Sequence, residues 1–185
     1  MCLVRHGQTE WNKNFLIQGT IDIPLNDFGR ETTKNSIETI KSLNIEFDVF
    51  LSSPLSRAIE TAEIIKDGLN FNGEIKIFQG LIERDFGVLE GKSVCKESYD
   101  LMEIGVEGLE MLPDLQERAL KTILDINRIF PNKKILLTTH SQFIKGLLSK
   151  VLDDFEFSFP LKNNSLTLIE VDNDNVKVIE YNIIK

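Results

Sequence analysis

The sequence predicts an α/β domain in which a mostly parallel central sheet carries helices on both faces and a β-hairpin closes the chain. Segments with strand character alternate with segments with helical character along the sequence. Residues 135–139 (ILLTT) form an apolar run that ends in threonine, which is typical of a strand buried on both faces of a parallel sheet. Two further strand-like runs, 165–171 and 176–181, flank the turn sequence DNDN and predict the hairpin.

The first part of the chain contains two predicted strand–helix units. Residues 2–5 form a short buried strand that ends in a loop, and cap and turn signals begin a helix over 26–44. The run FDVFLS at 47–52 is the next strand. Ser53 is the expected N-cap and Pro54 the expected first residue of the following helix, because serine caps helix amides and proline fits the first helical position.

The second part of the chain continues the alternation. Residues 75–78 predict a short strand, and apolar residues on one side of 115–130 predict an amphipathic helix. Pro131 ends that helix, because proline cannot continue the hydrogen-bond pattern. Another helix covers 141–152, directly after the ILLTT strand.

The length and composition predict one globular domain over residues 1–185. The formal net charge of −8 argues against a nucleic-acid partner and against an anionic membrane surface, because both attract basic proteins. No apolar run approaches the roughly 20 residues that a membrane span needs. Cys2 and Cys95 lie in unrelated contexts, so we expect two free thiols in a reducing cytoplasm.

Basic side chains follow three of the predicted strands. Arg5 and His6 follow the first strand, Arg57 lies in the first turn after FDVFLS, and the chain's other histidine, His140, follows ILLTT. Because loops at the carboxyl ends of neighbouring parallel strands converge, we expect these side chains to share one crevice. Arginine offers a planar fork of donors to phosphate oxygens, and a neutral imidazole is a nucleophile near pH 7. Glu83 is the best candidate for the proton donor that such a site needs.

Five segments carry a resemblance to a known family. In chain order they are LVRHGQTEWN, QGTIDIPLNDFG, LSSPLSRAIETAEII, LIERDFGVLEG and TTH. Together they resemble the ordered motifs of the histidine phosphatase superfamily, which includes cofactor-dependent phosphoglycerate mutase and many small phosphatases. The resemblance covers nearly the whole chain, and it implies a phosphoglycerate mutase-like fold and phosphoryl transfer through a phosphohistidine.

The resemblance also implies roles for the four basic residues. His6 is expected to attack phosphorus and become phosphohistidine, while Arg5 and Arg57 bind the phosphoryl oxygens. His140 is expected to stabilise the charge from the opposite side. Phosphoryl transfer depends mostly on positioning and electrostatic stabilisation, which suits a site of this composition.

The remaining implied roles concern the substrate ester. Glu83 protonates the leaving oxygen and later activates water, Asn12 donates a further hydrogen bond, and Gln18 and Gly19 lie near the bound ester. We expect neither a metal nor a cofactor, because the cations of this site are side chains.

Simpler structural roles compete with these assignments. A lone histidine at a strand end is usually structural, and His140 could merely cap the helix that follows it. Arg57 could pair with Glu60 or Glu63 on its own helix surface, which is a common and weak interaction. Glu83 lies in a charged cluster that could be solvated. The surrounding motifs favour the catalytic roles for His6, His140 and Glu83. For Arg57, the expected Ser53-Pro54 helix start after a strand favours the catalytic role.

Two positions depart from the family pattern. Ser141 follows His140 where glycine is usual, so a side chain beside the phosphate either crowds the site or adds a hydroxyl donor. Lys145 occupies a position where arginine is more usual. Both departures bear on rate and substrate rather than on fold.

A cap-like insertion at about 91–118 is expected to cover the cleft. It contains seven acids and three cations, so we expect it to repel a second anionic group and to admit a neutral or partly apolar leaving group. This favours a phosphomonoester hydrolase for a small phosphorylated metabolite, similar to the broad-specificity or α-ribazole phosphatases. The alternatives are a phosphoglycerate mutase and a phospholigand-binding regulatory protein that has lost catalysis. The sequence leaves the oligomeric state open.

Overall fold

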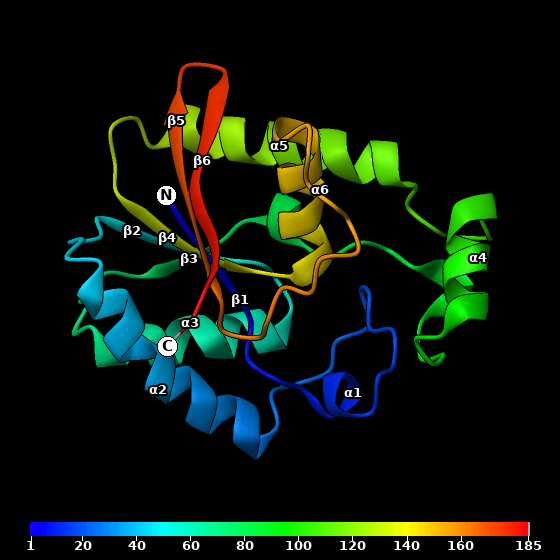
Figure 1. Cartoon of the computed structure of the whole chain (residues 1–185). Coiled ribbons are helices and arrows are strands. Elements are labelled where there is room, and N and C mark those ends of the chain that lie inside the picture. The colour runs from blue at the N-terminus through cyan, green and yellow to red at the C-terminus, as the bar shows by residue number, and fades with distance from the viewer. Residues whose placement is uncertain (185) are drawn as a thin grey trace.

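A six-stranded sheet forms the centre of the protein in the computed structural model, which describes residues 1–184 (Figure 1). Its strands are β1 (Cys2–Arg5), β2 (Val49–Ser52), β3 (Ile75–Ile77), β4 (Ile135–Thr139), β5 (Leu166–Asp172) and β6 (Asn175–Ile183). The strand order is β3-β2-β4-β1-β5-β6. The pairs β1–β4, β2–β4 and β2–β3 are parallel, whereas β5 is antiparallel to both β1 and β6. The predicted mostly parallel sheet with a closing hairpin is confirmed.

Helices cover both faces of this sheet. They are α1 (Glu10–Lys13), α2 (Asp27–Ser42), α3 (Ser56–Gly68), α4 (Lys96–Ile104), α5 (Leu112–Ile129) and α6 (Ser141–Val151), with short 3₁₀ helices η1 (Gln79–Leu81) and η2 (Gly87–Leu89). Figure 1 shows α2 and α3 on one face and α5 and α6 on the other. The short helices α1, η1 and η2 and the helix α4 were not predicted from the sequence. Within residues 1–184, no helix combines the length and the apolar character that crossing a membrane requires.

The start of α3 differs from the prediction. The helix begins at Ser56, its N-cap residue is Leu55, and no side chain caps it. Pro54 therefore precedes the helix, and the expectation that Ser53 is its N-cap is wrong. The additional residues between β2 and α3 turn the Ser53 hydroxyl toward His140, whose Nε2 lies 2.6 Å away.

Alternate residues of the central strands pack into two separate cores. In β1, Leu3 belongs to the core under α5 and α6, whereas Cys2 and Val4 belong to the core under α2 and α3. In β4, Leu137 belongs to the core under α5 and α6, and Leu136 belongs to the core under α2 and α3. A central strand that is covered on both faces needs apolar side chains on both, which explains the continuous apolar run in ILLTT.

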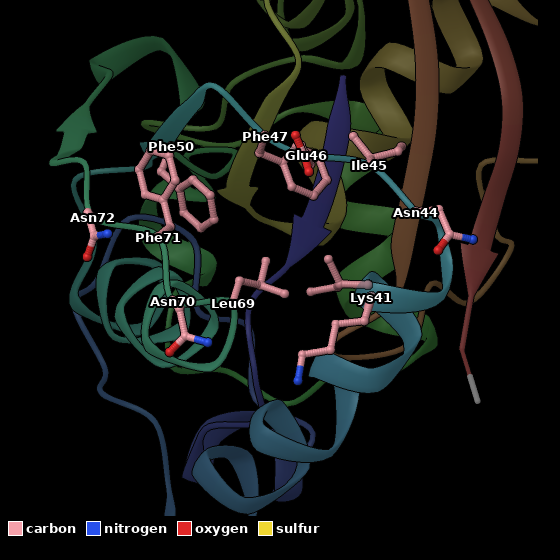
Figure 2. Close-up of a pocket in the computed structure, with 11 residues that line it drawn as sticks. Lys41, Asn44, Ile45, Glu46, Phe47, Phe50, Leu69, Asn70, Phe71 and Asn72 are labelled. Carbon is pink, nitrogen blue, oxygen red and sulfur yellow. The ribbon is translucent and has the colours of Figure 1, made fainter.

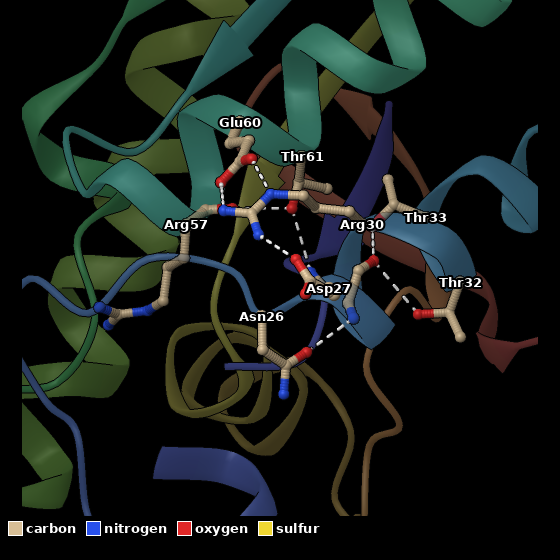
Figure 3. A network of polar contacts seen from close by, with 10 residues as sticks. Asn26, Asp27, Arg30, Thr32, Thr33, Arg57, Glu60 and Thr61 are labelled. Atoms are coloured by element: carbon tan, nitrogen blue, oxygen red, sulfur yellow. Dashed lines mark hydrogen bonds and ion pairs between the residues drawn. The ribbon is translucent and has the colours of Figure 1, made fainter. Parts of the chain in front are cut away.

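Arg30 joins α2 to α3. Its Nε donates to Glu60 at 2.5 Å, and its Nη1 donates to Asp27 at 3.0 Å. Figure 3 shows Glu60 facing Arg30, whereas Arg57 extends away from both residues. Glu60, one of the two surface partners considered for Arg57, therefore pairs with Arg30.

The helix α4 lies outside the layered part of the fold, beside the start of α5 (Figure 1). A small core attaches it to the loops near η2; this core contains Ile17, Phe86 and Leu89 packed against Leu101, Met102, Val106 and Leu109. Residues 112–118, which the sequence assigned to the cap, form the first turns of α5 instead. The part of the insertion that can cover a cleft is therefore α4 with its flanking loops.

A hollow of about 590 Å³ lies near the amino end of β2 (Figure 2). Phe50 and Phe71 stack in its wall with ring centroids 4.3 Å apart. Asn44 and Asn70 also line it, and each follows a helix with a positive φ of 52° or 54°. Lys41 and Glu46 are the charged residues that line this hollow, and none of the residues predicted for catalysis lines it.

Candidate active site

The predicted site residues meet at the carboxyl ends of β1, β2 and β4. A cavity of about 170 Å³ is lined by eight of the nine: Arg5, His6, Asn12, Gln18, Gly19, Arg57, Glu83 and Ser141. The ninth, His140, is fully buried and does not line the cavity, and its ring centroid lies 5.1 Å from that of His6. The convergence expected from the strand ends is therefore present in the structure.

His6 is buried, and its ring is oriented by the main chain. Its Nδ1 lies 2.7 Å from the carbonyl oxygen of Gly7. Because a carbonyl oxygen can only accept, Nδ1 carries the hydrogen and Nε2 keeps its lone pair. Burial, and next the charges of Arg57 and Arg5, lower the pKa of His6 well below its usual value. The imidazole is therefore neutral at pH 7, which is the form that can act as a nucleophile.

Two polar side chains hold the loop that follows His6. The hydroxyl of Thr61 accepts from the backbone N–H of Gly7 at 3.0 Å, and Nδ2 of Asn163 donates to the carbonyl of His6 at 2.9 Å. Thr61 lies in the LSSPLSRAIETAEII motif, but its role was not predicted. Nothing in the sequence around Asn163 points to this contact.

Arg57 is fully buried in the first turn of α3. Its Nη1 donates to the carbonyl of Ile21 at 2.9 Å and its Nη2 to the carbonyl of Gly19 at 2.7 Å. Its Nε is buried and has no hydrogen-bond partner within residues 1–184. The side chain therefore points into the site rather than toward Glu60 or Glu63.

Arg5 supplies a second guanidinium. Its Nη1 donates to the carbonyl of Leu161, and its buried Nε has no partner in the described part of the chain. Burial lowers the pKa of Arg5 to about 10, with Glu83 opposing the change and Arg57 adding to it. Arg5 thus stays charged at pH 7. Two buried cations with unused donors favour an anion between them.

His140 is held by Ser53 and not by a capping contact. It occupies the N-cap position of α6, but its side chain makes no cap hydrogen bond. Nε2 lies 2.6 Å from the Ser53 hydroxyl, whereas the buried Nδ1 has no partner among residues 1–184. Burial, followed by the charge of Arg57, lowers the pKa of His140 well below its usual value. The simple cap role considered from the sequence does not describe this histidine.

Glu83 is buried with an exposed fraction of 7% and is bound by backbone amides. Its carboxylate accepts from the N–H groups of Arg84 at 3.0 Å, Phe143 at 3.1 Å and Gln142 at 3.2 Å. The last two amides belong to the first turn of α6, so the start of this helix fixes the position of the Glu83 carboxyl group. Ser141 begins that turn and lines the same cavity. Glu83 is thus a positioned group rather than a member of a solvated cluster.

The amides of Asn12 and Gln18 are arranged to donate. Oδ1 of Asn12 accepts from the N–H of Thr9 at 3.2 Å and from Asn163 at 3.3 Å. Oε1 of Gln18 accepts from the Thr9 hydroxyl at 2.8 Å. With the oxygens engaged by protein donors, the NH₂ groups are the ends available to a ligand in the cavity.

Glu90 shapes the loop that contains Gly19. Its carboxylate accepts from the N–H of Thr20 at 2.7 Å and from the N–H of Ile21 at 3.2 Å. Gly19 has a φ of +53°, and a Cβ at this position would lie 1.9 Å from Oε1 of Glu90. Both observations explain why glycine occupies position 19. Glu90 lies near the end of the LIERDFGVLEG motif, in which a role was predicted for Glu83 but not for Glu90.

Within residues 1–184, no group of three or more His, Cys, Asp or Glu side chains is arranged to hold a metal ion. The unpartnered nitrogens at the cavity include two guanidinium donors, those of Arg5 and Arg57. This arrangement can bind an oxyanion and place it against a neutral imidazole.

Comparison with known proteins agrees with this geometry. The sequence pattern of the histidine phosphatase superfamily (branch 1) matches residues 1–184. The uncharacterized phosphatase PhoE of Bacillus subtilis (strain 168) is 34% identical over 185 residues, covering 99% of this chain and 94% of that protein. A 2,3-bisphosphoglycerate-dependent phosphoglycerate mutase of Parvibaculum lavamentivorans is 33% identical over 171 residues, covering 82% and 79%.

A solved structure gives the same result. Phosphoserine phosphatase from Entamoeba histolytica, crystallised with 3-phosphoglyceric acid, superposes with a TM-score of 0.82 at 27% sequence identity. The alignment covers 100% of this chain and 96% of that one. The ordered motifs, the whole-chain sequence match and the shared fold lead to one conclusion: the chain belongs to the histidine phosphatase superfamily, branch 1, with phosphatases and phosphoglycerate mutases as its relatives.

Proposed function

We propose that the chain is a phosphomonoester hydrolase that moves the phosphoryl group of a small phosphorylated metabolite to His6 and then to water. The observation that carries this proposal is the state of His6. It is a buried, neutral imidazole whose Nδ1 hydrogen is bound by Gly7, and it lies beside two arginines with unused donors. A neutral nucleophile beside a preformed oxyanion site is what phosphoryl transfer requires.

In the first step, the phosphoryl oxygens accept hydrogen bonds from Arg5, Arg57 and Asn12. Nδ1 of His140, which is free of protein partners in the described chain, contributes from the other side. These groups are preorganised, because Arg57 is already bound to two carbonyls and His140 to Ser53. Preorganised donors stabilise developing charge without reorganisation during the reaction.

In the second step, Nε2 of His6 attacks phosphorus and the ester P–O bond breaks. Glu83 gives its proton to the leaving oxygen, so the product leaves as an alcohol. In the third step, Glu83 as carboxylate takes a proton from water, and the resulting oxygen nucleophile breaks the P–N bond. Inorganic phosphate leaves, and His6 and protonated Glu83 are restored. A general acid and base contributes about 10²–10⁴-fold to such a reaction.

We further propose that this chemistry needs no bound metal, because arginine and histidine side chains supply the positive charge at the phosphoryl group. Ser141 can add a hydroxyl donor beside the phosphate, since it lines the cavity at the start of α6.

The test is an assay of the purified protein and its His6→Ala variant in the presence of a chelator. The panel contains p-nitrophenyl phosphate, sugar phosphates, nucleoside phosphates and α-ribazole phosphate. We expect phosphate release that resists the chelator and disappears with His6→Ala. The protein should also take up label from a labelled phosphate ester, and the variant should not. Release that persists in His6→Ala would refute the proposed nucleophile.

Phosphoglycerate mutase activity is the second candidate, because a mutase is 33% identical over most of this chain. Adding 3-phosphoglycerate with and without 2,3-bisphosphoglycerate to the panel separates the two reactions. A mutase isomerises phosphoglycerate with little free phosphate, whereas a hydrolase releases phosphate. No turnover and no labelling across the panel would instead support a phospholigand-binding protein.

A further inference from the structure

A second cavity adjoins the catalytic one and shares part of its wall. The catalytic cavity has a volume of about 170 Å³ and the neighbouring one, here called the side cavity, about 560 Å³. Tyr99, Met102 and Gln142 line both. Sites for small molecules usually measure about 300–1,000 Å³, so the catalytic cavity alone is too small for more than the phosphoryl group and its nearest atoms. The rest of a substrate must extend beyond it.

The walls of the side cavity are mostly apolar. They are formed by α4, the start of α5, the start of α6 and a later loop, through Tyr99, Met102, Met111, Leu112, Pro113 and Phe157. Its charged members are Arg84, Glu103 and Lys145. Of the seven acids in the sequence of the cap, Glu103 is the one that lines this cavity, and Glu110 is bound by Arg118 at 2.6 Å. The expectation that the cap presents its acids to the leaving group is therefore wrong for most of them.

Lys145 differs from the other two charged residues of the side cavity. Glu103 is exposed, and Arg84 donates to the carbonyl of Glu110. Arg84 and Lys145 each also lie over an aromatic ring, that of Phe86 and that of Phe157. Lys145 has an exposed fraction of 9%, and its Nζ makes a single hydrogen bond, to the carbonyl of Phe157 at 3.0 Å. It forms no ion pair within residues 1–184. An ammonium has three donors, so two remain for a ligand.

A buried cation without an ionic partner is costly, because burial disfavours the charged form. Burial lowers the pKa of Lys145 to about 8, with Arg5 adding to the decrease and Glu83 opposing it. A bound anion would reverse the desolvation cost by pairing with the ammonium. Lys145 lies in the second turn of α6, and the cavity that it lines shares a wall with the catalytic cavity, so one substrate molecule can extend from the phosphoryl site to Lys145.

We propose that the side cavity holds the leaving group of the substrate, that this group has an apolar body with a carboxylate, and that Lys145 pairs with the carboxylate. The inference rests on the proposed function and names the class of ester that the site prefers. It also reverses the expectation from composition that a second anionic group is repelled, because Glu103 is the one acid of the cap that lines the cavity that the leaving group enters.

The test compares two esters that differ only in the carboxylate, phenyl phosphate and 3-carboxyphenyl phosphate. For the unchanged protein, we expect kcat/KM to be about 10-fold or more higher for the carboxylated ester, because its carboxylate accepts a hydrogen bond from a charged donor. Lys145→Met should bring the ratio close to one while phenyl phosphate turnover changes little. Lys145→Arg should keep the preference. Lys150→Met is the matched control, since Lys150 lies on the same helix but is exposed.

The pH dependence gives a second readout. Titration of Arg5, His6 or Glu83 affects phosphoryl transfer from both esters, so it cancels in the ratio of the two kcat/KM values. Arg84 also lines the side cavity, but an arginine keeps its charge over this pH range. Tyr99 and Glu103 complete the titratable groups around the cavity. We expect the ratio to fall as the pH rises through about 8, where Lys145 loses its proton, and to be independent of pH in Lys145→Met.

The outcomes separate the two proposals. Turnover of both esters with a ratio near one would overturn the inference about Lys145 and leave the hydrolase assignment in place. A preference that survives in Lys145→Met would also overturn it. Absence of turnover for both esters would overturn this inference, and the panel described above would then decide the proposed function separately.

Discussion

At the scale of single residues, the site depends on side chains whose orientation is set by the backbone. The ring of His6 is oriented by the carbonyl of Gly7, and the carboxylate of Glu83 is bound by three amides. Ser53 binds the ring of His140, and Asn163 binds the carbonyl of His6. Because these contacts do not depend on the substrate, removing one chemical group should change one step of the reaction and leave the geometry of the others.

Glu83→Gln tests this separation. The variant cannot protonate the leaving oxygen, so we expect kcat/KM for an alkyl phosphate to fall by about 10²–10⁴-fold. The fall should be much smaller for p-nitrophenyl phosphate, because nitrophenolate leaves without a proton. Steady-state assays on both esters make the comparison, with the exposed neighbour Asp85→Asn as control. Equal losses on the two esters would show that Glu83 is not the general acid.

At the scale of secondary-structure elements, α2 sets the position of the loop that follows His6 by close backbone packing. A Cβ on Gly29 would lie 2.1 Å from the carbonyl oxygen of Gln8 and 2.8 Å from its nitrogen. Asn26, the N-cap of α2, accepts from the N–H of Gly29 at 2.7 Å, and its own N–H donates to the carbonyl of Gln8 at 3.0 Å. The first turn of α2 is therefore docked on the segment that follows His6.

Gly29→Ala should disturb this docking. Backbone atoms cannot move aside as a flexible side chain can, so we expect a loss of about 1–3 kcal/mol in the free energy of unfolding. Activity should also fall, because the displaced segment contains Gln8 and joins His6. Urea denaturation measures the first effect and phosphate release the second. Lys34→Ala, an exposed change on the same helix, should stay within about 0.5 kcal/mol. A fully active and stable Gly29→Ala protein would contradict the packing argument.

At the scale of the whole molecule, the fold keeps both of the chain's histidines neutral inside a cationic site. Burial and the nearby arginines lower the pKa of each below that of the unfolded chain. Below about pH 6.5 the unfolded state therefore binds protons that the folded state does not. The free energy of unfolding is unaffected by these groups above that pH and decreases as the pH falls below it.

Urea denaturation at pH 7.5 and 5.5, in a buffer without phosphate, measures this linkage. We expect each histidine to remove about 1 kcal/mol of stability at pH 5.5. In His6→Ala, the free energy of unfolding should lose the part of its pH dependence that comes from His6 and keep the part that comes from His140. If the stability of the unchanged protein is the same at the two pH values, the histidines are not held neutral by the fold.

The sequence by itself determined the architecture and the location of the site. The apolar runs of β1 and β4 require cover on both faces, and parallel strands bring their carboxyl ends to one edge, so Arg5, His6 and His140 had to meet there. Both statements follow from local periodicity and chain direction. The same reasoning predicted the closing hairpin from the turn between β5 and β6.

Only the tertiary structure decided which polar groups hold one another. Ser53 has the local signature of a helix cap, but it binds His140, which lies 87 positions away. Asn163 binds the carbonyl of His6 across 157 positions, and Glu90 holds the loop at Thr20. The sequence shows how many acids the cap contains, but it does not show which of them face the cavity. Periodicity reports whether a side chain is buried, whereas the partner of a polar group depends on which distant segments pack together, and a single sequence does not encode that locally.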